Sequence, residues 1–250
     1  MKLKDKTALV TGGGTGVGRA ITLMLAQLGA SVAVNYSKSQ RDAEATVADA
    51  KQLSVRAVTV QADVADDAQV HRMVDRVTQE LGTVDILINN AAFTRFTDQA
   101  DLYALSQQDW NRTFSVNVNG AFFCCRAVAP MMKARGWGRI VNISSVAAFS
   151  GKGSSIAYAA SKAAIISITK SLARVLGPEV TVNAIAPGLI ETRWIANHPR
   201  LEEIRESYVK ETVLGRVLKP EDIAEVAVSL ITSMNLVTGQ TIVVDAGRTV

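Results

Sequence analysis

Three residues in the middle of the chain have the types and spacing needed to move a proton at a carbonyl or alcohol oxygen. Ser145 ends the segment Asn-Ile-Ser-Ser; after twelve intervening residues, Tyr158 opens Tyr-Ala-Ala-Ser-Lys and stands four positions before Lys162. Side chains four apart share one face of a helix. The Lys162 ammonium is therefore expected to lower the pKa of the Tyr158 phenol from about 10. A tyrosine tuned in this way exchanges protons near neutral pH, while the serine hydroxyl polarises the carbonyl.

A glycine-rich turn near the N-terminus supplies the context for this chemistry. The apolar segment 7–10 leads into Thr-Gly-Gly-Gly-Thr-Gly-Val-Gly at 11–18, and a helical pattern follows. Strand, glycine turn and helix are what a dinucleotide site requires, because the N–H groups at the helix start meet the phosphates. Gly12 permits the tight turn, Gly16 lets the backbone approach pyrophosphate, and Gly18 lets the helix pack close to the sheet.

Composition narrows the class of protein. The 250 residues are 48% hydrophobic, and no linker or charge block divides them, so we expect a single domain over 1–250. No apolar run approaches the roughly 20 residues of a membrane span, and the N-terminus leads directly into a strand pattern. We therefore expect a cytoplasmic protein without a membrane partner. The net charge is +4, but the basic residues are scattered, which disfavours nucleic acid.

The cysteines and histidines predict no metal site. Cys124 and Cys125 are adjacent in a helical pattern and are expected to be buried and inert. His71 and His198 stand in polar surroundings and form no ligand set.

Apolar segments alternate with amphipathic ones along the whole chain. This pattern predicts an α/β fold, with a doubly wound parallel sheet covered by helices on both faces. The predicted strands are 7–11, 31–35, 56–61, 84–89, 138–144, 180–186 and 241–245. The predicted helices are 17–28, 39–53, 67–81, 108–135, 156–176 and 220–232, with a shorter one near 200–211.

The ordered motifs resemble the short-chain dehydrogenase/reductase superfamily over the whole chain. The matching residues are the glycine turn, Asp63-Val64, Asn89-Asn-Ala-Ala92, Asn117, Ser145, Tyr158, Lys162, Asn183, Pro187-Gly188, Gly239 and Asp245-Ala-Gly247. The resemblance implies a Rossmann-like, seven-stranded parallel sheet in the order 3-2-1-4-5-6-7. It also implies a carbonyl–alcohol oxidoreductase, most similar to the 3-oxoacyl-carrier-protein reductases.

By this resemblance, Asn117, Ser145, Tyr158 and Lys162 form a catalytic tetrad. Ser145 holds the substrate oxygen, Tyr158 supplies or removes the proton, and Lys162 binds the nicotinamide ribose. Asn117 holds a water near Lys162 in a proton relay. Ser144 competes for the serine role, but the gap to Tyr158 favours Ser145.

The end of the second predicted strand favours NADP over NAD. An acidic residue there would bind the ribose 2′-hydroxyl of NAD, whereas basic residues accept the 2′-phosphate of NADP. Ser37, Lys38 and Arg41 follow that strand before any acid occurs, although they also fit a solvated helix start. The full set of expected cofactor-binding residues is Gly12, Thr15, Gly16, Val17, Gly18, Tyr36, Ser37, Lys38, Asp63, Val64, Asn89, Ala91, Tyr158, Lys162, Pro187, Gly188, Ile190 and Thr192.

The substrate is less determined than the reaction. The resemblance places Phe93, Arg95, Phe96, Phe149, Ile156 and Trp194 at the substrate mouth, under a lid at about 193–216. Lys133, Arg135 and Arg139 offer a basic approach for an acidic carrier protein. Three alternatives stay open: an NAD-dependent alcohol or sugar dehydrogenase, an enoyl reductase (disfavoured by the Tyr-to-Lys spacing of four) and a non-catalytic dinucleotide-binding regulator.

The resemblance also implies a homotetramer. Its contacts would be made by the helices at 108–135 and 156–176 and by the C-terminal strand. Apolar residues on broad helix faces fit this expectation: Ala121, Phe122, Ala164, Ile165 and Ile168.

Overall fold

Seven parallel strands form one sheet in a computed structural model that describes residues 3–192 and 201–250. The spatial order is β3-β2-β1-β4-β5-β6-β7, as expected. The strands are β1 (Thr7–Val10), β2 (Ser31–Tyr36), β3 (Ala57–Gln61), β4 (Val84–Asn89), β5 (Gly138–Ile143), β6 (Val180–Pro187) and β7 (Thr241–Val244). All seven predicted strands are confirmed to within a residue or two of their ends.

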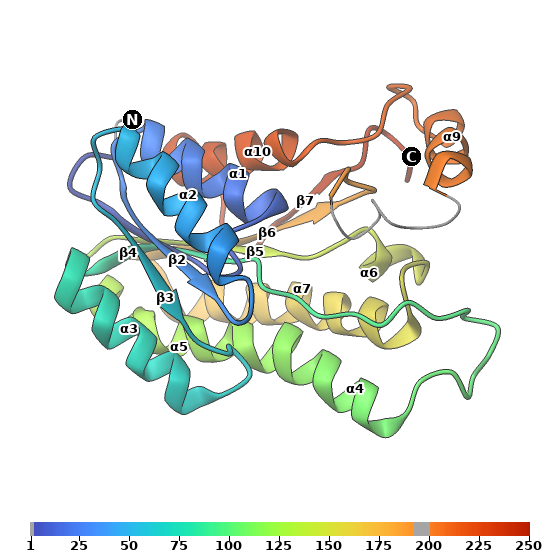
Figure 1. Ribbon diagram of the computed structural model, residues 1–250, viewed down its shortest axis with the longest axis horizontal. Helices are drawn as coiled ribbons and strands as arrows, with labels where there is room; N and C mark the ends of the chain where they lie inside the picture. The colour runs from blue at the N-terminus through green and yellow to red at the C-terminus, as the bar shows by residue number, and fades with distance from the viewer. Residues whose placement is uncertain (1–2, 193–200) are drawn as a thin grey trace.

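Helices cover both faces of this sheet (Figure 1). One layer holds α1 (Gly16–Gln27), α2 (Gln40–Gln52) and α10 (Pro220–Thr232). The other holds α3 (Asp67–Leu81), α4 (Gln107–Phe114), α5 (Ala121–Ala134) and α7 (Ile156–Leu176). Two further helices, α6 (Ala147–Ser150) and α9 (Leu201–Glu211), lie beyond the carboxyl ends of the strands. The Rossmann-like fold class is therefore confirmed.

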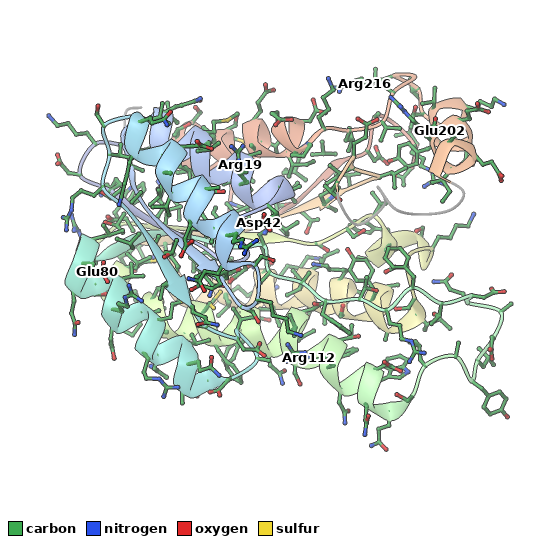
Figure 2. The ribbon with its side chains drawn as sticks, viewed as in Figure 1. Arg19, Asp42, Glu80, Arg112, Glu202 and Arg216 are labelled. Carbon is green, nitrogen blue, oxygen red and sulfur yellow. The ribbon has the colours of Figure 1, made fainter. Side chains whose placement is uncertain are left out.

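Charged side chains mark the outer surface of these layers. Figure 2 shows Glu80 on α3 and Glu202 on α9 pointing away from the sheet. Local caps fix where helices begin: the Asp66 carboxylate accepts a hydrogen bond from the Gln69 N–H at 3.0 Å, and Pro220 opens α10. Such caps satisfy N–H groups that the first helical turn leaves without partners.

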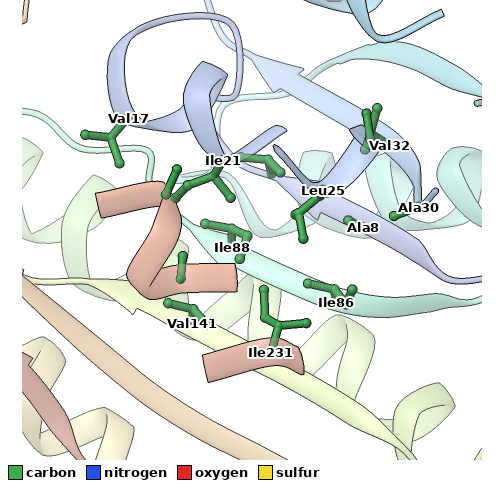
Figure 3. Packing of buried hydrophobic residues seen from close by; sticks show 14 of the residues in the cluster. Ala8, Val17, Ile21, Leu25, Ala30, Val32, Ile86, Ile88, Val141 and Ile231 are labelled. Carbon is green, nitrogen blue, oxygen red and sulfur yellow. The ribbon is translucent and has the colours of Figure 1, made fainter. Parts of the chain in front are cut away.

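The hydrophobic core lies between the sheet and each helical layer. On one face, Ile21 and Leu25 of α1 and Ile231 of α10 pack over Ala8 and Ile86 of the central strands (Figure 3). On the other face, a second cluster joins α3 and α5 to the same sheet. Burial on both sides explains why β1, β4, β5 and β6 are wholly buried and rich in apolar residues.

The long helix predicted at 108–135 is interrupted. A π-helical stretch, Ser115–Gly120, separates α4 from α5 and contains Asn117. The short helix α6 was not predicted either. Hydrophobic spacing does not reveal either feature, because a six-residue π-helical stretch and a four-residue helix are too short to give a periodic pattern of their own.

The topology itself locates a binding crevice. From β1 the chain crosses to β2 on one side, and from β3 it crosses back to β4 on the other. At such a switch point the loops after neighbouring strands separate and leave a crevice at the carboxyl ends. Within the described part of the chain, the helices do not combine the length and apolar character needed to cross a membrane.

Candidate active site

A cavity of about 610 Å³ occupies this crevice. That volume lies in the usual range for small-molecule and cofactor sites. Most of the predicted site residues line it: Gly12, Thr15, Gly16, Val17, Tyr36, Ser37, Lys38, Asp63, Val64, Ala91, Ser145, Tyr158, Lys162, Pro187, Gly188, Ile190 and Thr192. Three predicted residues, Gly18, Asn89 and Asn117, are outside this lining.

The glycine turn between β1 and α1 has the shape of a phosphate cradle. Gly12 and Gly16 have φ angles of +60° and +51°, which glycine adopts readily. A Cβ on Gly18 would collide with the Gly12 carbonyl oxygen, and one on Gly14 would lie 2.8 Å from the Ala43 nitrogen. Gly18 therefore acts through packing beneath the turn, as expected. The first turn of α1 has no acidic residue, so its N–H groups fit a phosphate.

Asn35 holds this turn against β2, a role that the sequence analysis missed. Its Oδ1 accepts a hydrogen bond from the Gly12 N–H at 3.3 Å, and its Nδ2 donates to the Ala62 carbonyl at 3.1 Å. The side chain is buried and contributes to the cavity lining. The sequence does contain one signal for this role: an asparagine stands near the end of a strand whose other residues are mostly apolar.

Beyond β2, the cavity wall is polar and carries a positive charge. Ser37 and Lys38 line it, and neither aspartate nor glutamate lines this stretch among the described residues. Arg41 is exposed and lies outside the lining. Of these three residues, Ser37 and Lys38 thus line the cavity.

The loop after β3 presents a fixed carboxylate to the cavity. Asp63 Oδ1 accepts a hydrogen bond from the Ala65 N–H at 3.0 Å. Its Oδ2 lies 2.9 Å from Nη2 of Arg112, which reaches it from α4 (Figure 2). Arg112 itself lines the cavity, yet nothing in the sequence pattern around it indicated this contact.

Ser145, Tyr158 and Lys162 meet on one wall of the cavity. Ser155 begins α7 by accepting a hydrogen bond from the Tyr158 N–H at 3.2 Å. The Tyr158 side chain is partly accessible from the cavity, but desolvation by the surrounding protein raises its pKa to about 12, and a hydrogen bond with Ser145 opposes the rise. Lys162 is buried, which lowers its pKa to about 8. The expected lowering of the tyrosine pKa is therefore wrong for this structure.

The position of the ammonium explains this correction. Lys162 Nζ donates a hydrogen bond to the Ile143 carbonyl at 2.7 Å and lies 5.6 Å from the centroid of the Tyr158 ring. Its charge is thus directed at a backbone oxygen, and burial is the largest influence on the pKa of Tyr158. The geometry also separates the two serines, because Ser144 donates to the Lys162 carbonyl at 2.8 Å whereas Ser145 pairs with Tyr158.

Asn117 is committed to the protein through both of its side-chain polar atoms. Its Oδ1 accepts from the Phe93 N–H at 2.7 Å, and its Nδ2 donates to the Phe93 carbonyl at 3.0 Å and to Ser161 Oγ at 2.9 Å. The side chain is 2% exposed. It therefore joins the segment after β4 to α7, the helix of Tyr158, and it lies outside the cavity lining.

Asn89 is another expected cofactor residue that lies outside the cavity lining. It is buried and donates to Asn142 Oδ1 at 2.8 Å, which ties β4 to β5 below the site. Its neighbour Asn90 lines the cavity and donates to the carbonyls of Thr11 and Gly12 at 3.0 and 3.1 Å. Alternate residues of a strand face opposite sides, and only the structure reveals which of the two faces the crevice.

The predicted substrate mouth is only partly assembled as expected. Phe93 and Phe96 line the cavity, whereas Phe149 and Ile156 do not. Arg95 forms a 2.7 Å ion pair with Asp109 and also lies outside the lining. Trp194 falls outside the described residues, as do Arg193 and His198. Two cations that the sequence analysis did not consider, Lys152 and Arg248, line the cavity instead.

The basic patch expected to receive a carrier protein lies at the wrong edge of the sheet. Arg139 is at the amino end of β5, 7% exposed, donating to Asn235 at 2.9 Å and lying over Trp137. Arg135 lies 3.4 Å from the buried Asp85. Lys133 is exposed near the same edge. Because all strands are parallel, this edge is opposite the cavity, so the three residues cannot line the approach to it.

The cysteines are buried as predicted. Burial raises the pKa of both thiols, that of Cys125 to about 12. Over residues 3–192 and 201–250, no group of three or more His, Cys, Asp or Glu side chains is arranged to hold a metal ion.

The fold and the site define a dinucleotide-dependent oxidoreductase, and comparison with known proteins identifies the family. Residues 12–249 match a family model described as Enoyl-(Acyl carrier protein) reductase. The chain belongs to the short-chain dehydrogenase/reductase superfamily and is an NAD(P)-dependent oxidoreductase.

Individual relatives cover nearly the whole chain. A 3-oxoacyl-[acyl-carrier-protein] reductase of Thermotoga maritima is 38% identical over 249 residues, covering 99% of each chain. A ketoacyl reductase of the granaticin polyketide synthase of Streptomyces violaceoruber is 39% identical over 96% of this chain and 94% of its own length. A solved structure described as a short-chain alcohol dehydrogenase from Sinorhizobium meliloti superposes with a TM-score of 0.92 at 32% identity, covering 99% of this chain and 97% of that one.

Proposed function

We propose that the protein interconverts a carbonyl and a secondary alcohol with NADP, and that Tyr158 is the acid/base. The observation that carries this proposal is the pairing of Ser145 with Tyr158, above the buried Lys162, on the wall of a cavity that the glycine turn also lines. The bound nicotinamide supplies or accepts the hydride.

Each residue of this wall has one task in the proposed reduction. The Ser145 hydroxyl donates a hydrogen bond to the substrate oxygen as negative charge develops there. Tyr158 gives its phenolic proton to that oxygen, and in the reverse direction it removes the proton of the alcohol. Lys162 binds the ribose of the cofactor. Asn117 acts through position, because its bonds to Phe93 and Ser161 hold the segment after β4 against α7.

The cofactor proposal depends on the end of β2. Ser37 and Lys38 line the cavity where the adenosine ribose is expected. An ammonium and a hydroxyl favour a 2′-phosphate by charge-assisted hydrogen bonds, whereas the ribose 2′-hydroxyl of NAD calls for a carboxylate. We therefore favour NADP over NAD.

For the substrate, we favour a 3-oxoacyl thioester, including one presented by a carrier protein. The support is that two relatives at 38–39% identity are named as 3-oxoacyl-carrier-protein and ketoacyl reductases. The description of the matching family model raises enoyl reduction as a second candidate. Carbonyl reduction is the better fit because Tyr158 and Lys162 are one helical turn apart and Ser145 bonds the phenol. An alcohol or sugar dehydrogenase would not prefer thioesters, and a silent dinucleotide-binding regulator would show no turnover.

Four further expectations are part of this proposal. The chain acts as one catalytic domain. The helix α9 belongs to a substrate lid at 193–216, of which residues 193–200 lie outside the described part of the chain. The enzyme is cytoplasmic, and it is a homotetramer. Of the apolar residues expected at subunit contacts, Phe122 is 39% exposed, whereas Ala121 and Ile165 are already buried within the chain.

The test is NADPH and NADH oxidation by the purified protein against paired substrates. Acetoacetyl and crotonyl thioesters of N-acetylcysteamine differ in offering a ketone or a C=C bond; aryl ketones, alkyl ketones and keto-sugars complete the panel. Turnover of the acetoacetyl thioester supports the proposal. Turnover of the crotonyl thioester alone would move the assignment to enoyl reduction, and NADPH binding with no turnover on any member would favour the regulator.

A further inference from the structure

Two cations border the substrate end of the cavity without a role in the proposed chemistry. Lys152 and Arg248 both line it. Lys152 precedes Gly153, where an added Cβ would lie 3.5 Å from Cδ1 of the Tyr158 ring. Arg248 comes from the C-terminal tail after β7. Segments almost a hundred residues apart thus bring two positive charges to the same cavity.

Arg248 is held in a defined orientation by the helix α9. Its Nε and Nη2 donate to the same oxygen, Glu211 Oε2, at 2.9 and 2.6 Å. Its guanidinium carbon lies 4.6 Å from the centroid of the Tyr208 ring. Tyr208 is 3% exposed, and its hydroxyl oxygen accepts a hydrogen bond from the Leu189 N–H at 2.8 Å. Because Leu189 also lines the cavity, this chain of contacts fixes the guanidinium relative to the site.

The guanidinium keeps donors for a ligand. Arginine has five N–H donors in a planar fork that matches a carboxylate or phosphate. Glu211 Oε2 takes one donor from Nε and one from Nη2. The Nη1 amino group of Arg248 has no hydrogen-bond acceptor among residues 3–192 and 201–250. The edge of the fork that contains Nη1 is therefore available for a second oxyanion.

The nearby carboxylates are already hydrogen-bonded within the protein. Glu211 bonds Arg248 and Ser207, and the pKa of Glu211 is lowered chiefly by these bonds, with a smaller contribution from the charge of Lys152. Lys152 has no ion-pair partner within the described segments. The other nearby carboxylate, Asp245, accepts hydrogen bonds from the Gly247 N–H and from Thr249 within the tail. Both carboxylates thus already accept hydrogen bonds, and of the two cations only Arg248 is paired with Glu211.

We propose that Arg248 and Lys152 form an anion subsite that binds a carboxylate or phosphate carried by the substrate. Arg248 receives the oxyanion on its free edge, Lys152 contributes charge from the opposite segment, and Glu211 is the internal counter-charge that orients the guanidinium. The inference rests on the proposed function, since it names the substrate class of the same cavity. It predicts that the enzyme prefers carbonyl substrates with an anionic group to neutral ones of the same length.

The test compares matched substrates in Arg248→Gln, Lys152→Met and Glu211→Gln proteins. One arm uses 3-oxobutanoate, 4-oxopentanoate and 5-oxohexanoate against their methyl esters. The other uses acetoacetyl 4′-phosphopantetheine against acetoacetyl pantetheine, so that a substrate carboxylate is distinguished from a carrier phosphate. The matched control is Arg76→Gln, which removes an arginine–glutamate pair on the outer face of α3.

We expect kcat/KM for the anionic member of the responding pair to exceed that of the neutral member about tenfold in wild type. Arg248→Gln abolishes that preference while leaving kcat/KM for the neutral substrate within about twofold of wild type. Lys152→Met reduces the preference, and Arg76→Gln leaves it intact. Glu211→Gln increases this preference, because it removes the negative charge that competes with the ligand while the amide oxygen still accepts a hydrogen bond from Arg248. Equal activity on both members, or equal losses on both in Arg248→Gln, would overturn the subsite and leave carbonyl reduction standing.

A binding measurement keeps this test independent of turnover. Calorimetric titration of the NADP-loaded protein with 4′-phosphopantetheine, pantetheine, 4-hydroxypentanoate and its methyl ester compares the same charges without chemistry. If no ketone is reduced but the anions bind more tightly than their neutral partners, and Arg248→Gln removes the difference, the subsite stands and the proposed reaction fails. If no anionic ligand outbinds its partner, the subsite is wrong.

Discussion

The ammonium of Lys162 donates a hydrogen bond to the carbonyl oxygen of Ile143 at 2.7 Å. Ile143 is the last residue of β5, two positions before Ser145, and Lys162 stands one helical turn after Tyr158 on α7. This bond therefore joins the element that carries the serine to the element that carries the tyrosine. It also places a buried charge where its protonation affects folding stability.

We expect the stability contributed by Lys162 to rise with pH between about 8 and 10. Burial lowers the pKa of Lys162 to about 8 from 10.5. Within this window the unfolded chain keeps a proton that the folded protein has released, so the free energy of unfolding increases with pH, by at most about 1.4 kcal/mol per pH unit. Above pH 10 the raised pKa of Tyr158 acts in the opposite direction, because the unfolded tyrosine then loses its proton first.

Urea unfolding at pH 7.5, 8.5 and 9.5 measures this effect. Wild type should gain stability relative to Lys162→Met across the series, whereas Lys170→Met, which alters an exposed lysine on the same helix, should run parallel to wild type. Parallel curves for wild type and Lys162→Met would contradict the buried-charge argument.

Replacing Tyr158 by phenylalanine removes the phenolic proton while keeping the ring. We expect kcat for ketone reduction to fall more than about 100-fold, the size of a lost general acid, with NADPH affinity unchanged. Because the pKa of Tyr158 is raised to about 12, wild-type Tyr158 stays protonated from pH 6 to 8. Reduction should then be nearly independent of pH in that range, whereas alcohol oxidation should increase as pH rises. Stopped-flow measurements give the turnover, and fluorescence titration gives the NADPH affinity. Near-normal turnover of the variant would refute the role assigned to Tyr158.

The adjacent serines provide a matched pair for separating chemistry from structure. Ser145→Ala should lower kcat about 100-fold with little change in stability, because its hydroxyl faces Tyr158 and the substrate oxygen. Ser144 is 2% exposed and donates to the Lys162 carbonyl at 2.8 Å, so Ser144→Ala should cost about 1–2 kcal/mol of stability and much less activity. Thermal unfolding and turnover of both variants check the assignment; the reverse pattern would make Ser144 the catalytic serine.

Local sequence determined part of this site, and tertiary contacts determined the rest. The glycine turn and the Ser145–Tyr158–Lys162 set were predictable, because each depends on residues close in sequence within one βα unit or one helix. The pKa shift of Tyr158 was not, since its direction depends on burial and on where the Lys162 ammonium points. Asn89 and Asn90 could not be told apart, because one step along a strand reverses the direction of a side chain.

The substrate end was the least predictable region. Lys152 and Arg248 both line the cavity there, and Tyr208 and Glu211 of α9 hold the C-terminal tail that carries Arg248. Neither cation belongs to a motif, and the arginine that looked suitable by sequence, Arg95, is paired with Asp109 outside the cavity. Contacts of this kind arise from packing of distant segments, which spacing along the chain does not encode.

Lys38 should determine the preference for the phosphorylated cofactor. It lines the cavity at the end of β2, and a 2′-phosphate there gains a charge-assisted hydrogen bond. We expect Lys38→Met to lower kcat/KM for NADPH about tenfold and to leave NADH within about twofold. Lys51→Met, an exposed lysine near the end of α2, is the control. A wild-type ratio of kcat/KM for NADPH over NADH below one would refute NADP specificity.

Arg112 should affect both cofactors equally, which distinguishes it from Lys38. Asp63 presents its carboxylate between the Ala65 N–H and Arg112 Nη2, so Arg112 orients a carboxylate that we expect to accept a hydrogen bond from the adenine amino group. Adenine is common to NADPH and NADH. Arg112→Met should therefore raise KM for each about threefold to tenfold, since an exposed pair contributes roughly 1 kcal/mol, with kcat unchanged. Arg112→Lys should restore part of the affinity. A change confined to NADPH would instead place Arg112 at the ribose phosphate, and a loss of kcat would show that it acts through α4 on Asn117.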